Sequence, residues 1–253
     1  MMGKTRPLRS LGLWGSALFL TPSMGFIAGT SALMGDRRGK VWWSATQSWA
    51  AGIIRSAGVT DLIVKGVEKI YDGAPYILMA NHQSNLDPPS IIRSSIRPIG
   101  FLTKQELKRV PVFGWALERT GHVFIDRKDK DKSHASIDKA AERVAEGRCV
   151  LVFPEGTRSL TEDLLPFKKG GFVLALKAHV PIVPIGISGT REIFPSQSKV
   201  VVGKGPVALV YGEPIDTREY TLENKDGLME RVRTAIVALR GEAHALVAAK
   251  KGS

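Results

Sequence analysis

Short runs of β-branched and apolar residues alternate with helix-like segments from about residue 59 to the end of the chain. Such alternation is typical of an α/β domain, in which helices cover a sheet. The 253 residues can bury one substantial core, and no repeat or low-complexity linker divides them. We therefore expect one α/β domain over residues 59–253, with a mixed sheet and flanking helices.

The predicted strands and helices follow from local patterns of apolar residues, glycine and proline. The strands are expected at Asp61–Val67, Pro75–Ala80, Pro98–Thr103, His122–Asp126, Cys149–Phe153, Pro181–Ile187 and, as a late pair, around Val200–Val202 and Val207–Tyr211. The helices are expected at Ser90–Ile96, Val112–Arg119, Lys130–Glu146, Gly170–Ala178 and about Leu222–Ala249. Helices thus fall between most of the predicted strands.

The N-terminal region contains a long uncharged run. Residues Ser10–Gly35 carry no charge and have basic residues on both sides, and the run is long enough to span a membrane. Pro22 divides the run, however, and equal basic clusters at both ends give no positive-inside asymmetry. A signal peptide, a single spanning helix and a shallow helical hairpin in one leaflet are therefore the three alternatives for it.

Residues Lys40–Ala57 predict a helix that returns along the membrane interface. One face carries apolar residues at helical spacing, namely Trp42, Ala45, Trp49, Ile53 and Ala57. Tryptophan favours the lipid headgroup region, although a tryptophan-rich helix packed on the domain core is the alternative. We expect residues 1–58 to be membrane-anchoring helices of a monotopic or single-pass protein of the cell membrane, with the α/β domain on the cytoplasmic face.

Composition narrows the choice of partner. The formal net charge of +12 indicates an anionic partner, and no aromatic and basic residues interleave as nucleic-acid stacking platforms do. We therefore expect a phospholipid bilayer or phosphate-bearing substrates, and no nucleic acid.

The one cysteine, Cys149, lies in an apolar run and predicts a buried thiol. Five histidines without metal-ligand spacing predict no metal site.

Polar residue types suited to chemistry gather where predicted strands end. His82 and Asp87 follow the strand at Pro75–Ala80, and a tight turn can fold the carboxylate onto the imidazole. The acid then orients the ring and stabilises the imidazolium, so that His82 can take a proton from an alcohol without a serine nucleophile. In the alternative, Asp87 is an ordinary helix cap and His82 bonds a turn carbonyl.

Two further strand ends carry an acid and a base. The segment 121–127 ends in Asp126 and Arg127, and the turn after the strand Cys149–Phe153 contains Glu155, Gly156, Thr157 and Arg158. A guanidinium binds phosphate oxygens with two prongs, and backbone amides in a glycine turn add donors. This turn therefore suits a phosphate, with an ordinary solvated turn as the alternative.

Four blocks stand in order along the chain: His-x4-Asp at 82–87, Gly-x-x-x-Ile-Asp-Arg at 121–127, Phe-Pro-Glu-Gly-Thr-Arg-Ser at 153–159 and Val-Pro-Ile-Val-Pro at 180–184. With them the sequence resembles, over about Val64–Gly212, the glycerolipid acyltransferases that include 1-acyl-glycerol-3-phosphate acyltransferase. The resemblance implies an O-acyltransferase of phospholipid biosynthesis that needs no metal and no cofactor. Its fatty acyl group would move from acyl-CoA or acyl carrier protein to the sn-2 hydroxyl of lysophosphatidic acid, giving phosphatidic acid.

The resemblance also implies roles for single residues. His82 and Asp87 form the catalytic pair, as general base and orienting acid, and Arg158 binds the acceptor phosphate. The residues expected to bind substrate are Lys104, Arg127, Glu155, Gly156, Thr157 and Arg158. Two alternatives stay open at this stage. One is the same chemistry on glycerol 3-phosphate or another lysophospholipid, and the other is a non-catalytic basic protein of the membrane surface.

Overall fold

Seven strands form one mixed sheet within the described part of the chain. The computed structural model describes residues 9–16, 23, 27, 30, 31, 40–70, 73–109, 114, 117, 122–125 and 130–252. The strands are β1 Val59–Lys65, β2 Ile77–Ala80, β3 Ile99–Lys104, β4 Val123–Ile125, β5 Cys149–Val152, β6 Ile182–Ser188 and β7 Gly205–Tyr211. Their order is β1-β7-β6-β2-β5-β3-β4, and only β6 and β7 pair antiparallel. The predicted fold class is confirmed.

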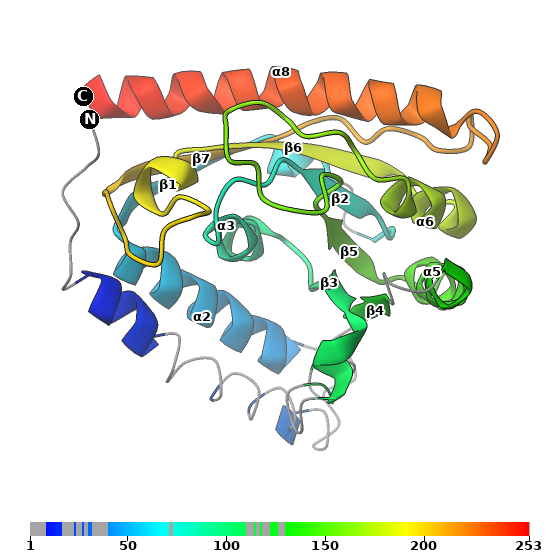
Figure 1. The fold of residues 1–253 in the computed structure, drawn as a ribbon, viewed down its shortest axis with the longest axis horizontal. Coiled ribbons are helices and arrows are strands. Elements are labelled where there is room, and N and C mark those ends of the chain that lie inside the picture. Colours follow the sequence, from blue (N-terminus) through cyan, green and yellow to red (C-terminus); the bar gives the residue numbers. More distant parts are fainter. Residues whose placement is uncertain are drawn as a thin grey trace.

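Helices cover both faces of this sheet (Figure 1). The helices are α2 Lys40–Ala57, α3 Asp87–Ser94, α5 Lys130–Ala145, α6 Gly170–Ala178, α7 Thr190–Ile193 and α8 Lys225–Gly252, with short 3-10 helices at Val67–Lys69 and Gln105–Arg109. Along β2, Leu78 packs in one core cluster with α2 and α3, while Met79 packs in another with α5, α6 and α8. Alternate side chains of a strand point to opposite faces, so the sheet separates two hydrophobic layers.

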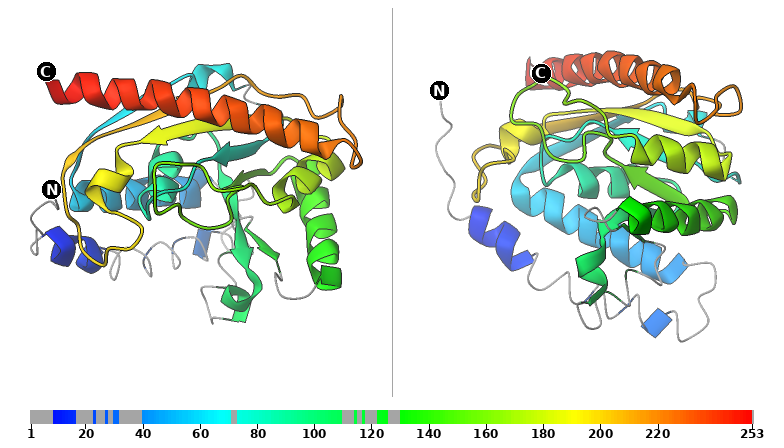
Figure 2. Two further views of the ribbon diagram at one scale, coloured as in Figure 1. Left: turned by 45° about the horizontal axis from the view of Figure 1, so that its top comes forward. Right: turned by 45° about the vertical axis from the view of Figure 1, so that its right-hand side comes forward.

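The long helix α8 lies directly on β6. The further views in Figure 2 agree with Figure 1 in placing α8 along one side of the sheet and α2 on the other. A Cβ atom on Gly186 of β6 would lie only 2.2 Å from the backbone nitrogen of Arg240 in α8. Only glycine allows the two backbones to approach so closely. The C-terminal helix is therefore part of the core rather than an appendage.

Several elements differ from the predicted ones. Residues Val200–Val202 form no strand, because Val201 is buried and the amide of Val202 donates to the carbonyl of Ile193 at 2.9 Å instead of to a neighbouring strand. Helix α3 begins at Asp87, three residues before the predicted start, and α7 was not predicted. The predicted helix at Val112–Arg119 lies outside the described residues except at 114 and 117, which are helical.

Helix α2 packs on the domain. Trp42, Ala50, Ile53 and Ala57 belong to the same buried cluster as Leu78 of β2, which is the packing that the alternative for this helix expected. The membrane-anchoring role of residues 1–58 and the domain boundary at residue 58 stay predictions.

The predicted membrane location needs a correction. The uncharged run at Ser10–Gly35 is described only at 10–16, 23, 27, 30 and 31. Of the helices in the described ranges, none combines the length and the apolar character that a membrane crossing requires. The predicted localisation, a monotopic or single-pass protein of the cell membrane with its catalytic domain on the cytoplasmic face, is thus contradicted in its single-pass form.

The carboxyl ends of the parallel strands meet at one edge of the sheet. β6, β2, β5, β3 and β4 run in the same direction, so the loops that follow them emerge side by side. Open α/β sheets present their ligand sites at this edge. The loops after β2, β5 and β6 carry the residues described next.

Candidate active site

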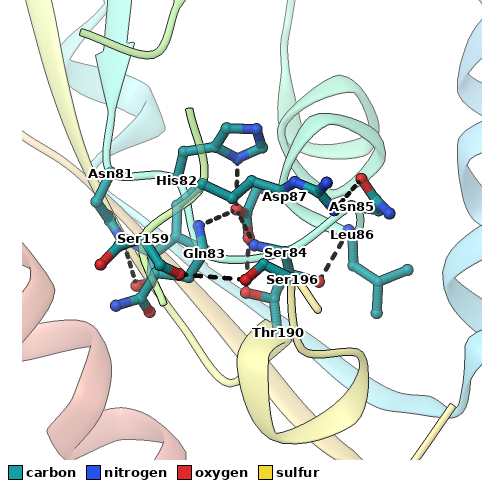
Figure 3. Close-up of polar contacts among 12 residues, drawn as sticks. Asn81, His82, Gln83, Ser84, Asn85, Leu86, Asp87, Ser159, Thr190 and Ser196 are labelled. Carbon is teal, nitrogen blue, oxygen red and sulfur yellow. Dashed lines mark hydrogen bonds and ion pairs between the residues drawn. The ribbon is translucent and has the colours of Figure 1, made fainter. Parts of the chain in front are cut away.

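His82 and Asp87 touch in the turn between β2 and α3. Nδ1 of His82 lies 2.9 Å from Oδ2 of Asp87 (Figure 3). The His82 side chain is 16% exposed, whereas Asp87 is fully buried. An ionised carboxylate can only accept a hydrogen bond, so the ring proton belongs on Nδ1. Nε2 is then the ring atom that can accept a proton from a substrate.

The Asp87 carboxylate is held by several donors. Oδ2 accepts the backbone amides of Gln83 at 2.7 Å and Ser84 at 2.8 Å, and Oδ1 accepts the hydroxyl of Thr190 at 2.6 Å. Asp87 also begins α3, where the helix dipole favours a negative charge. The N-cap of α3 is Leu86, so Asp87 does not act as the ordinary cap of the alternative. These contacts stabilise the charged carboxylate and direct Oδ2 at the ring.

The backbone of His82 is clamped by the loop after β5. Its amide donates to Oε1 of Glu155 at 2.8 Å, and its carbonyl accepts the amide of Ser159 at 2.7 Å. The His82 ring stacks on Phe153, with ring centroids 3.9 Å apart and an angle of 16°. The ring therefore sits between a buried acid and an aromatic face that both restrict its movement.

Glu155 is buried and contacts backbone rather than solvent. Its second oxygen, Oε2, accepts the amide of Leu165 at 2.8 Å, so that the carboxylate joins two loops. Burial raises the pKa of Glu155 above its ordinary value, while the hydrogen bonds from Leu165 and His82 oppose that rise. Substrate binding by Glu155 stays a prediction, but the contacts that the structure describes point to positioning of His82.

Arg158 connects the two loops at the surface. Its Nη1 donates to Oδ1 of Asn85, in the β2–α3 turn, at 2.8 Å. Gly156 and Thr157 are exposed in the same turn, and Gly156 has a φ of +73°, a value that favours glycine. The guanidinium thus lies on the same edge as His82, where a phosphate could reach it.

The other two predicted basic residues are placed less fully. Lys104 ends β3 and pairs with Ile125 of β4, which brings its backbone to the same edge of the sheet. Arg127 lies outside the described residues. In the described ranges no group of three or more His, Cys, Asp and Glu side chains could hold a metal ion. The expectation of no metal and no cofactor stays a prediction.

Three residues of the site had no predicted role. Thr190 contacts Asp87, and the Asn81 side chain both donates to the carbonyl and accepts the amide of Ile187, which ties the turn to β6. The Ser84 hydroxyl donates to the carbonyl of Phe194 at 2.6 Å. Asn81 lies directly before the His-x4-Asp block and Ser84 lies inside it, so their positions could have indicated a role in the site. Thr190 had only its position shortly after the predicted strand Pro181–Ile187.

Comparison with known proteins gives a consistent result. A family model described as Acyltransferase matches residues 61–188, about half of the chain. A 1-acyl-sn-glycerol-3-phosphate acyltransferase of Chlamydomonas reinhardtii is 37% identical over 164 residues, 65% of this chain and 48% of its own length. The chloroplastic enzyme of that name, BAT2, of Brassica napus is 36% identical over 168 residues, 66% of this chain and 48% of its own length. The chain thus spans about half the length of these relatives.

The crystal structure of the 1-acyl-sn-glycerophosphate (LPA) acyltransferase PlsC of Thermotoga maritima has the same fold. The TM-score is 0.78 at 28% identity, over 94% of this chain and 95% of that one. The matched residues contain the His-x4-Asp turn, the Glu155–Arg158 turn and the strand β6. The chain belongs to the acyltransferase family.

Proposed function

We propose that this protein transfers a fatty acyl group from an acyl thioester, acyl-CoA or acyl carrier protein, to the sn-2 hydroxyl of 1-acyl-glycerol 3-phosphate. The product is phosphatidic acid. The 2.9 Å contact between His82 and Asp87 carries the proposal, because it gives a partly exposed imidazole the tautomer that a general base needs. The names of the relatives support lysophosphatidic acid as the acceptor.

The proposed reaction needs no acyl-enzyme. Nε2 of His82 takes the proton of the acceptor hydroxyl while its oxygen attacks the thioester carbon, and a new C–O bond forms. The C–S bond then breaks, and the thiolate leaves with the proton from the imidazolium. A thiol of pKa about 8.5 is a good leaving group near neutral pH. Asp87 stabilises the imidazolium during the transfer.

The acceptor phosphate is proposed to bind Arg158. The guanidinium already reaches the His82 turn through Asn85, so a phosphate bound to it would hold the neighbouring hydroxyl near His82. Lys104 and Arg127 are proposed to bind the same phosphate. Glycerol 3-phosphate and other lysophospholipids share the phosphate and a free hydroxyl, so a panel of acceptors must separate them.

The test replaces His82 with alanine and measures acyl transfer with each acceptor and with both acyl donors. Because a positioned general base contributes about 10² to 10⁴ in rate, kcat should fall by at least a hundredfold. His244→Ala is the matched control, since this histidine is exposed on α8. A loss of only a few fold in His82→Ala would remove the base from the mechanism.

A second variant separates binding from chemistry. Arg158→Gln should raise the KM for the lysolipid about tenfold or more and change kcat less, because the phosphate loses a charged partner. Arg218→Gln is the control, because Arg218 is exposed and pairs with Asp216 away from the turn. An unchanged acceptor KM in Arg158→Gln would mean that the phosphate binds elsewhere.

A further inference from the structure

The hydroxyl of Thr190 reaches the side of Asp87 that faces away from the histidine. Thr190 is the first residue of α7 and lies beyond the segment 61–188 that the family model matches. We propose that Thr190 is a positioning residue, which sets the orientation of the Asp87 carboxylate and through it the tautomer and orientation of His82. This inference rests on the proposed function and adds a residue to its machinery.

The two oxygens of Asp87 have different partners. Oδ2 faces three nitrogen atoms, those of the His82 ring and of two backbone amides, whereas Oδ1 accepts the Thr190 hydroxyl at 2.6 Å. Figure 3 shows His82, Asp87 and Thr190 joined in succession by these contacts. A carboxylate can rotate about its Cβ–Cγ bond, and bonds to both oxygens restrict that rotation more than bonds to one oxygen alone. Thr190 supplies the bond on the far side.

The fold holds the Thr190 hydroxyl in place. Thr190 is 1% exposed and follows Gly189, whose φ is +96°. A Cβ on Gly189 would lie 2.3 Å from the carbonyl oxygen of Pro206. Only glycine therefore fits at the position directly before Thr190.

The segment after Thr190 is also docked on the catalytic turn. The Ser84 hydroxyl donates to the carbonyl of Phe194, and Ser84 forms a bridge with Pro195. The β-branched Thr190 has few χ1 rotamers, so a backbone fixed in this way also fixes the direction of its hydroxyl. The hydroxyl is therefore aimed before any substrate binds.

The test compares Thr190→Val, which removes the hydroxyl at nearly constant shape, with Thr190→Ser, which keeps it. We expect kcat to fall about tenfold in Thr190→Val, because small misplacement of catalytic groups is costly, while the KM values for both substrates stay within twofold. Thr190→Ser should keep kcat within twofold of the wild-type value. Equal loss in both variants would overturn the proposal, because the hydroxyl would then not be the group that matters.

A matched control separates positioning from general stability. Thr217 is 2% exposed and donates to the carbonyl of Val180 at 3.0 Å, far along the chain from the catalytic turn. Thr217→Val also removes one buried hydroxyl, and its kcat should equal that of the wild type. If Thr190→Val and Thr217→Val have the same kcat, the proposal is overturned.

A substrate-free measurement distinguishes this proposal from the proposed function. Nitrogen NMR of the imidazole of His82 should show a single tautomer with the proton on Nδ1 in the wild type, and a mixture in Thr190→Val. An unchanged tautomer in Thr190→Val would overturn the positioning role whatever the activity. If the wild type acylates no lysolipid while the tautomer still changes, the proposed function fails and the positioning role stands.

Discussion

The turn after β2 and the loop after β5 meet at His82, but they differ in how much of their support comes from distant parts of the chain. In the turn, the Asp87 carboxylate has three partners within five residues, namely the ring of His82 and the amides of Gln83 and Ser84, and one distant partner, the Thr190 hydroxyl. The loop after β5 is held by side chains from distant parts of the chain. Arginines of α7 and α8 donate to its carbonyls, namely Arg191 to Leu160, Arg240 to Glu162 and Arg233 to Leu164 and Leu165.

The difference separates the reacting group from its support. Contacts between residues close in sequence cost little loop-closure entropy, so the local contacts of the His82–Asp87 turn can form once its strand and helix form. One path from the distant contacts to that turn runs through Glu155, whose carboxylate accepts the amides of both Leu165 and His82. The chemistry is thus local, whereas its alignment depends on the whole domain.

The largest effect is expected from a substitution in the turn after β2. Asp87→Asn removes the charge that stabilises the imidazolium and turns an amide group toward donors that need an acceptor, so kcat should fall about a thousandfold or more. Asp61→Asn is the control, because Asp61 is half exposed and lies 3.6 Å from Lys250. Steady-state kinetics on both variants measures the effect, and a loss below tenfold in Asp87→Asn would contradict a role for the carboxylate.

The same difference explains what could be predicted from the sequence. The strands β2, β5 and β6 and the helix α6 were predicted almost to the residue, because apolar runs between turn residues signal them locally. His82, Asp87, Glu155 and Arg158 were singled out because each block is short and contiguous. Their meeting at one edge followed from parallel strands.

The long-range half of the site could not be predicted in this way. The sequence around Thr190 does not indicate that its side chain contacts Asp87. The sequence around Arg233 likewise does not indicate its contact with the loop after β5. The apolar residues Val200–Val202 resemble a strand in sequence, but the amide of Val202 donates to the carbonyl of Ile193 instead of to a neighbouring strand. The motif position of Glu155 likewise does not show that its side chain becomes buried.

Glu155→Gln tests the connection between the turn after β2 and the loop after β5. The amide group of glutamine can accept only one of the two backbone bonds well, so we expect kcat to fall about tenfold and the free energy of unfolding to fall by about 1–3 kcal/mol. Glu142→Gln, at an exposed position of α5, is the control. Urea unfolding and kinetics measure both effects, and wild-type kinetics in Glu155→Gln would break the link.

The pH dependence of stability sharpens this test. Burial raises the pKa of Glu155 above its ordinary value of 4.5, so the folded state keeps the proton to higher pH than the unfolded state. The folded state then binds more protons, and this group's contribution to the free energy of unfolding falls as pH rises from 4.5 through the raised value. The wild-type advantage over Glu155→Gln should therefore be greatest at low pH. A difference that does not vary with pH would contradict the raised pKa.

The smallest effect is expected from Arg233→Ala, which removes a contact between α8 and the loop after β5. Nη1 and Nη2 of Arg233 donate to the carbonyls of Leu165 and Leu164 at 3.0 and 3.1 Å, and the guanidinium lies 5.3 Å from the centroid of the Phe167 ring. Without them the loop loses one of its supports but keeps the contacts of Arg191 and Arg240. We expect kcat to fall about threefold to tenfold and protease cleavage within residues 160–165 to become faster.

Arg231→Ala provides a matched control on the same helix, because Arg231 is exposed and contacts only the neighbouring segment through Glu219 and Tyr220 among its described partners. Both variants remove an arginine from α8, so an effect of net charge or of helix propensity would appear in both. If alignment of His82 depends on the loop after β5, only Arg233→Ala should lower kcat, and Glu155→Gln should make the further loss in the double variant smaller than additive. Full additivity would place the effect of Arg233 outside the path through Glu155.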